Sequence, residues 1–149
     1  MTSQQPKKQP NVTVSVSRHF DQPAEKVFDA WLDPKTAGKW LFSTPTGKMV
    51  KVEIEARPGG HFTFTDRRDG EDIEHTGQYE VINCPRQIVF TFGVPKFTGK
   101  EVTRVLLDFV PAGKGCDLTL THEGVWADYA ERTKEGWGKI LAGLAGELG

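Results

Sequence analysis

The order of apolar and polar residues predicts one strand followed by two short helices at the start of the chain. Valines alternate with polar residues from Val12 to Ser17, which is the two-residue period of a half-buried strand. After Pro23, apolar residues recur at helical spacing over residues 24–32. A second short helix is expected to begin at Pro34, with Asp33 as its N-cap, and to run to Leu41.

Strand patterns dominate the middle of the chain. Alternating segments lie at about 50–54, 62–64, 74–82, 88–92, 102–110 and 118–122. Asp69-Gly70 predicts a tight hairpin, whereas residues 43–47 and 93–100 are expected to be loops. In the segment 102–110 the apolar side chains share one face, which places Arg104 on the outer face. Because the connections are short, the strands are expected to form an antiparallel meander.

The C-terminal segment changes to a helical period. Apolar residues recur at spacings of three and four from Trp126 to Leu148, which predicts one long amphipathic helix. Gly136 and Gly138 lie inside it, and glycine there favours a close approach by another segment. Only this helix is large enough to cover an apolar sheet face. The predicted fold is α+β: a curved antiparallel sheet of about six to seven strands around one long C-terminal helix.

Length and charge limit the classes of function. The 149 residues suit a single domain over 11–149, preceded by a polar tail at 1–10 that is expected to be disordered. The formal net charge of −1 argues against nucleic acid and against an anionic membrane surface as partners. The chain has neither a secretory leader nor an apolar run long enough to cross a membrane, so a cytoplasmic location is expected.

Motifs for a predefined reaction are missing from the sequence. It contains no P-loop, nucleophile elbow or zinc-protease motif, and we predict no catalytic residue, no metal site and no cofactor. Cys84 and Cys116 have no nearby cysteine partners and are interpreted as buried thiols, although a disulfide stays open. The acidic residues at 71–74 follow a hairpin tip and are interpreted as a solvated turn.

Aromatic residues carry the strongest indication of function. They make up 10% of the chain, and all four tryptophans lie on predicted helices. Such rings can simply fill a core, or they can line a cavity between a curved sheet and a helix. His122 shares a strand face with leucines and is either a satisfied core histidine or a ligand contact. The candidate ligand-binding residues are Trp40, Phe62, Phe64, Tyr79, Phe90, Phe92, Leu107, His122, Trp137 and Leu141.

A series of short motifs runs through the chain. The motifs are Arg18-x-Phe20-Asp21-x-Pro23-x-Glu25-x-Val27-Phe28-x-Ala30-Trp31, Asp33-Pro34, Trp40, Arg57-Pro58-Gly59-Gly60, Asp69-Gly70, Gly77-x-Tyr79-x-x-Ile82, Pro85-Arg86-x-Ile88-Val89-Phe90 and Gly136-Trp137-x-x-x-Leu141-x-x-Leu144. In their order and spacing they resemble the AHSA-type domains, relatives of the C-terminal domain of the activator of the heat-shock-protein-90 ATPase. The resemblance covers residues 18–148 and implies the SRPBCC (START-like, helix-grip) fold, in which a curved sheet grips the C-terminal helix around a hydrophobic cavity. Many relatives have a second aromatic directly after the tryptophan at position 40, where this chain has Leu41.

Three functions follow as expectations. The first is a non-catalytic binding module that holds a small hydrophobic or aromatic ligand between sheet and helix, as a monomer or homodimer. The second, implied by the resemblance, is a stress-response protein with a chaperone ATPase as its partner. The third is a cyclase- or dehydratase-type enzyme acting on an aromatic or polyketide-like substrate. That enzyme would need a buried titratable group, for which His122 and Tyr79 are the candidates.

Overall fold

The computed structural model describes residues 11–42, 47–99 and 101–148. The predicted tail at 1–10, most of the predicted loop at 43–47, and Lys100 lie outside the described residues. The elements follow in the order β1 (Asn11–Phe20), α1 (Ala24–Ala30), η1 (Ala37–Lys39), β2 (Lys48–Ile54), β3 (His61–Arg68), β4 (Glu71–Asn83), β5 (Gln87–Phe92), α2 (Pro95–Thr98), β6 (Thr103–Ala112), β7 (Gly115–Trp126), η2 (Ala127–Tyr129) and α3 (Ala130–Leu148).

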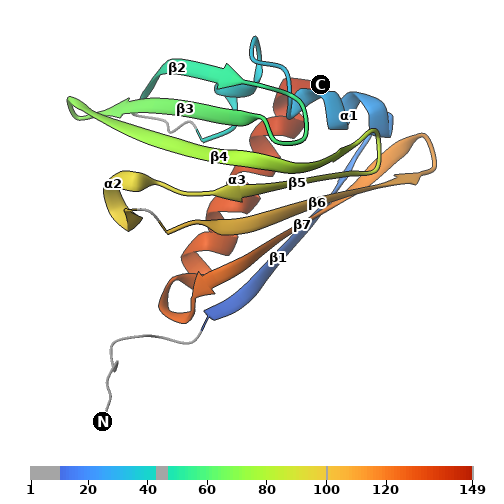
Figure 1. Cartoon of the computed structure of the whole chain (residues 1–149). Coiled ribbons are helices and arrows are strands. Elements are labelled where there is room, and N and C mark those ends of the chain that lie inside the picture. The colour runs from blue at the N-terminus through green and yellow to red at the C-terminus, as the bar shows by residue number, and fades with distance from the viewer. Residues whose placement is uncertain (1–10, 43–46, 100, 149) are drawn as a thin grey trace.

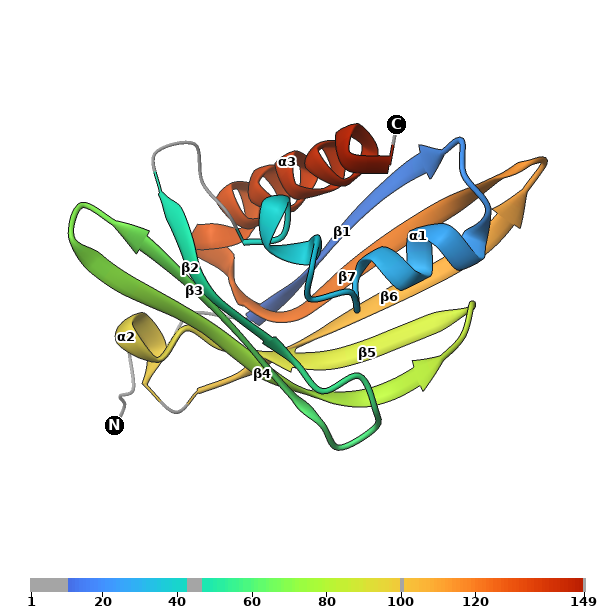
Figure 2. The ribbon, with the colours of Figure 1, turned by 90° about the horizontal axis from the view of Figure 1, so that it is seen from above.

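The strands form one curved antiparallel sheet. Its order is β1-β7-β6-β5-β4-β3-β2, so β2 to β7 make a meander and β1 pairs with β7 at one edge. Figure 1 shows the sheet face with α3 behind it, and Figure 2 shows how strongly the sheet bends between its two edges. The predicted α+β helix-grip class is confirmed. The second predicted short helix is the three-residue 3-10 helix η1.

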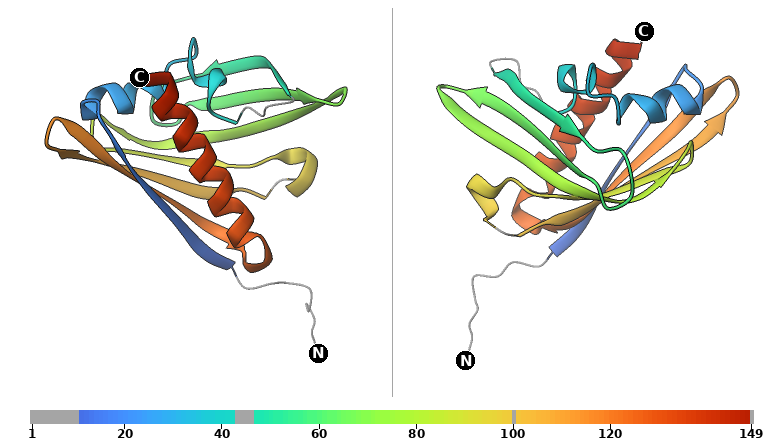
Figure 3. Two further views of the ribbon diagram at one scale, coloured as in Figure 1. Left: turned by 180° about the vertical axis from the view of Figure 1, so that it is seen from behind. Right: turned by 45° about the horizontal axis from the view of Figure 1, so that its top comes forward.

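Helix α3 covers the sheet because one of its faces is apolar. Trp137, Leu141 and Leu144 are its buried residues, spaced by four and three as one helix face requires. The helix runs diagonally across the sheet, as both views of Figure 3 show, and packs mainly on β1. The core between these layers also takes in α1, whose Val27 and Phe28 are fully buried.

The β3–β4 hairpin confirms the turn predicted at Asp69-Gly70. Asp69 has φ 51° and Gly70 has φ 80°. Two successive positive φ values give the backbone twist that a two-residue hairpin needs. The hairpin fixes the register of β3 against β4, in which Phe64 lies opposite His75.

Three expectations from the sequence are wrong in detail. Trp126 does not begin the long helix, because the ladder between β1 and β7 continues to this residue, which pairs with Asn11. Its side chain is 44% exposed. Cys84 is exposed, since it lies in the β4–β5 turn, whereas Cys116 is buried as expected and both thiols are free. The predicted loop at 93–100 contains the short helix α2, which begins at Pro95.

The two glycines of the long helix also differ from expectation. A Cβ atom added at Gly136 or Gly138 would meet no described atom within 4 Å, so no segment of the described residues approaches the helix there. The close approach is at Gly143, where an added Cβ would lie 3.4 Å from the Trp40 Cβ. None of the described helices is long and apolar enough to cross a membrane.

Candidate ligand-binding groove

A groove of about 710 Å³ opens between α3 and the part of the sheet that curves away from it. Its walls come from the segment that contains η1, from the ends of β3 and β5, from β4 and β7, and from α3. Its lining is mainly aromatic and basic. The residues are Lys39, Trp40, Phe42, Arg68, His75, Phe92, Val94, His122, Thr133, Gly136, Trp137, Lys139, Ile140 and Gly143.

Phe42 is the centre of the aromatic part of the groove. Its ring stacks on His75 at 4.9 Å between centroids and on Phe92 at 5.1 Å. It meets Trp137 edge-on at 5.9 Å, and it also contacts Phe62 and Phe64 from the core. These distances lie in the favourable range for aromatic pairs. The rings therefore form one wall that is continuous from β3 across to α3.

The backbone at Phe42 is unusual, and it explains how this ring reaches the groove. Phe42 has φ 61°, in the left-handed region that non-glycine residues seldom adopt. Leu41 follows Trp40 in the sequence, and the next residue, Phe42, supplies the ring. Because Phe42 is buried at 6% exposure, packing holds it in this conformation.

His122 connects the groove to the sheet through a chain of hydrogen bonds. Trp137 Nε1–H donates to His122 Nδ1 at 3.0 Å. Nδ1 is therefore the acceptor nitrogen, and His122 Nε2–H donates to Thr103 Oγ1 at 2.6 Å. The Thr103 hydroxyl donates onward to the Phe92 carbonyl at 3.2 Å. Each donor has an acceptor, and this requires the neutral Nε2–H form of His122.

Burial lowers the pKa of both groove histidines. The pKa of His122 falls from 6.5 to about 4 because burial disfavours the charged ring. Burial also lowers the pKa of His75, and the nearby Arg68 charge acts in the same direction, although the hydrogen bond to the Phe64 carbonyl opposes it. Near neutral pH both rings are uncharged members of the aromatic wall.

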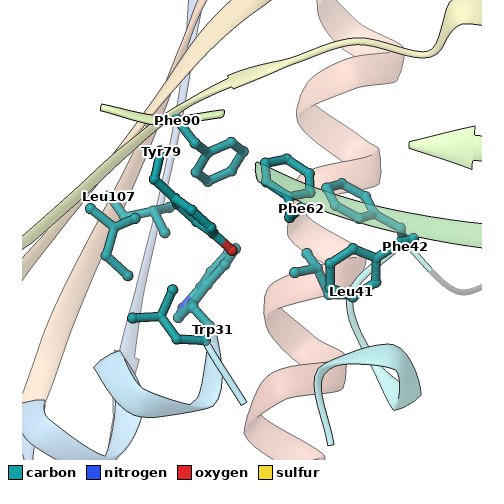
Figure 4. Close-up of a pocket in the computed structure, with 10 residues that line it drawn as sticks. Trp31, Leu41, Phe42, Phe62, Tyr79, Phe90 and Leu107 are labelled. Carbon is teal, nitrogen blue, oxygen red and sulfur yellow. The ribbon is translucent and has the colours of Figure 1, made fainter. Parts of the chain in front are cut away.

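A second, much smaller pocket lies deeper, between the sheet and α1. Its volume is about 10 Å³, which is close to the smallest space that holds a water molecule. Figure 4 shows the rings of Phe62, Tyr79 and Phe90 filling this region, with the Tyr79 hydroxyl pointing inward. Burial raises the pKa of Tyr79, so its hydroxyl stays protonated. The interior rings therefore pack as a core.

Two tryptophan N–H groups are buried without a hydrogen-bond partner among the described residues. They are Nε1 of Trp31, which lines the small pocket, and Nε1 of Trp40, which lines the groove. The two rings pack edge to face at 4.8 Å. An unsatisfied buried donor costs free energy in the folded protein.

The predicted ligand-binding residues divide between these two spaces. Trp40, Phe92, His122 and Trp137 line the groove. Five others line the small interior pocket: Phe62, Phe64, Tyr79, Phe90 and Leu107. Leu141 is buried at 1% exposure and lines neither. All ten share one hydrophobic region of the fold, and their role in ligand binding stays a prediction.

Sequence reasoning missed several residues of the groove. Phe42 and His75 supply rings, and Lys39, Arg68 and Lys139 supply the charges. Alternation along β4 could have placed His75 on the inner face with Tyr79, four residues further on. No sequence signal joins the three cations, which come from separate elements. Among the described residues no group of three or more histidine, cysteine or acidic side chains could hold a metal ion.

A single curved sheet that grips a long C-terminal helix, with an aromatic groove beside that helix, defines the helix-grip class of α+β domains. The sequence model for the family described as Activator of Hsp90 ATPase homolog 1-like protein matches residues 21–149. The chain therefore belongs to this family. No curated protein matches the chain significantly.

Solved structures of similar proteins carry the same fold. Protein CV1439 from Chromobacterium violaceum is 27% identical, with a TM-score of 0.80 over 90% of this chain and 94% of that one. SA2116 from Staphylococcus aureus, described as a protein of unknown function, is 15% identical, with a TM-score of 0.81 over 92% and 93%. Ms6760 from Mycobacterium smegmatis is 19% identical, with a TM-score of 0.77 over 94% and 98%. At these two lower identities the likeness concerns the fold alone.

Proposed function

We propose that the protein is a non-catalytic binding module that holds a small hydrophobic or aromatic molecule in the groove beside α3. The observation that carries the proposal is the groove of about 710 Å³, whose wall is built from stacked rings around Phe42. Its volume lies within the usual range for small-molecule sites, and its apolar lining is typical of them. Family membership supports the proposal, because the fold is of the SRPBCC ligand-binding type.

The hydrogen bonds of His122 favour binding over catalysis. Both ring nitrogens of His122 are engaged in hydrogen bonds, so neither is available to take a proton from a ligand. The groove thus supplies mainly apolar area, which suits recognition of an aromatic body.

The glycines of α3 provide the test. The neutral fluorescent probe N-phenyl-1-naphthylamine is expected to bind the wild-type protein saturably, with a Kd on the order of micromolar. Gly136 lines the groove, and a Cβ atom added there meets no described atom within 4 Å. The leucine of Gly136→Leu would therefore occupy part of the groove, and we expect it to raise the Kd for the probe at least about tenfold. Titration of probe fluorescence measures both values.

Gly138→Leu is the matched control. Gly138 lies on the same helix, its added Cβ also meets nothing within 4 Å, and it does not line the groove. Both leucines improve helix propensity by up to about 1 kcal/mol, so the two variants are expected to gain similar stability. Gly138→Leu is expected to bind the probe like the wild type. Equal binding by both variants, or no saturable binding at all, would contradict the proposal.

The family description favours a second candidate, namely an interaction protein that stimulates a chaperone ATPase. The measurement is the ATPase rate of the host Hsp90 with and without this chain. Turnover that rises with added protein would support this role, and unchanged turnover would remove it. The result is independent of the probe titration, because stimulation would require a protein surface and the groove accommodates a small molecule.

A further inference from the structure

The charged side chains that line the groove are basic. Lys39 ends η1, Arg68 ends β3 and Lys139 lies on α3, whereas no aspartate or glutamate among the described residues lines the groove. The whole chain, by contrast, has 19 basic and 20 acidic residues. Three separate elements thus each place one cation at an aromatic groove, a local excess that the composition does not predict.

Arg68 is held in place in a way that leaves its outer nitrogens available. Its Nε donates to Asp66 Oδ2 at 2.6 Å, and Asp66 is fully buried. The side chain of Arg68 is 32% exposed, and its terminal nitrogens make no hydrogen bond to the described residues. The nearest acidic residue on the facing strand, Glu71, pairs with Lys96 at 3.6 Å instead. A guanidinium fixed through Nε still offers its terminal N–H groups to an oxyanion.

Lys139 faces the groove from the helix and carries an unneutralised charge. It is exposed and makes no ion pair with any described residue. Lys39, by contrast, has its Nζ 4.0 Å from a Glu147 carboxylate oxygen. Around the groove, Lys139 therefore offers a charge without an ion pair among the described residues, and Arg68, whose ion pair with Asp66 is made through Nε, offers its terminal N–H groups to a negative charge on a ligand.

We propose that the ligand is an organic monocarboxylate with an aromatic or aliphatic body, its carboxylate meeting Arg68 and Lys139 and its body lying on the ring wall around Phe42. This inference rests on the proposed function and adds the charge and chemical class of the ligand. A carboxylate matches the planar guanidinium, and the apolar wall accounts for the remainder of the molecule. A neutral ligand of the same shape gains only the second set of contacts.

The test compares two probes of nearly the same shape, one charged and one neutral. The probes are 2-naphthoate and its primary amide, 2-naphthamide, titrated by calorimetry at about pH 7.5 in low salt. The carboxylate is expected to bind about tenfold more tightly than the amide, and its advantage is expected to shrink as salt screens the charges. Equal affinity for the two probes would overturn the monocarboxylate proposal.

Substitution of the two cations tests whether they cause the tighter binding of the carboxylate. Arg68→Gln is expected to remove most of the advantage of the carboxylate and to leave binding of the amide unchanged, and Lys139→Gln is expected to remove part of it. Lys134→Gln is the control, because Lys134 is exposed on the same helix outside the groove. An advantage that persists in Arg68→Gln and Lys139→Gln would overturn the proposal.

The outcomes separate this inference from the proposed function. If N-phenyl-1-naphthylamine and 2-naphthamide bind in a way that Gly136→Leu abolishes, but 2-naphthoate binds no better than its amide, only the monocarboxylate class fails. If none of the three probes binds saturably, both the proposed function and the monocarboxylate inference fail. Tight binding of 2-naphthoate that Gly136→Leu leaves intact would place the carboxylate elsewhere and would also overturn the inference.

Discussion

Replacement of Phe42 by alanine is expected to lower the free energy of unfolding by about 3–5 kcal/mol, the usual cost of deleting a buried aromatic ring. Phe42 is buried, and its ring touches His75, Phe92 and Trp137 in the groove as well as two phenylalanines of the core. Its removal opens a void among these rings. Urea denaturation followed by circular dichroism measures the change.

A second substitution at the same position tests the backbone argument. At φ 61° an L-residue costs about 1–2 kcal/mol that glycine avoids. Phe42→Gly is therefore expected to be more stable than Phe42→Ala by about 1 kcal/mol, the reverse of the usual order. At Phe109, in the middle of β6, glycine is expected to be the less stable replacement. Phe42→Gly proving less stable than Phe42→Ala would contradict the left-handed backbone at this position.

Lowering the pH from about 7.5 to about 5 is expected to cost about 2 kcal/mol of stability through His122 alone. Its pKa is about 4 in the folded protein and 6.5 when it is unperturbed. Between these two pH values the unfolded chain binds a proton at His122 that the folded chain does not. The contribution of His122 to the free energy of unfolding is therefore complete above pH 6.5 and is lost as the pH falls toward 4. The lowered pKa of His75 adds to the loss in the same direction.

His122→Gln separates this effect from the other titrating groups. Glutamine can still accept from Trp137 and donate to Thr103 but carries no charge, so stability measured by urea unfolding is expected to fall less steeply over this pH range. His19, whose pKa Asp117 raises through a hydrogen bond, acts in the opposite direction, but it is present in both proteins and cancels. Leu120→Ala is the control: it is destabilised at every pH and keeps the wild-type slope. A wild-type slope in His122→Gln would mean that the folded protein tolerates a charged His122.

Local sequence determined most of the architecture. The alternation of Val105, Leu107 and Phe109 fixes which face of β6 is buried, and Arg104 lies on the outer face as predicted. There it pairs with Glu80 at 2.8 Å. Asp69-Gly70 forms the predicted hairpin, and the apolar face of α3 follows the predicted helical period. These features depend on residues a few positions apart, so a single sequence contains the information for them. The helix start at Trp126 was misplaced because strand pairing with β1 overrides the local pattern.

Tertiary structure alone decided where the space for a ligand lies. Periodicity identifies inward-facing rings, but it does not distinguish rings that pack together from rings that line a groove. Phe62 and Tyr79 belong to the first kind, whereas Phe92 and Trp137 also line the groove. The bend of the sheet and the angle at which α3 crosses it set this difference, and both arise from contacts between segments far apart in the chain. The same long-range packing brings Phe42, Arg68 and Lys139 to one groove. Many contacts between distant segments fix the relative positions of these residues, and no local sequence pattern encodes those contacts.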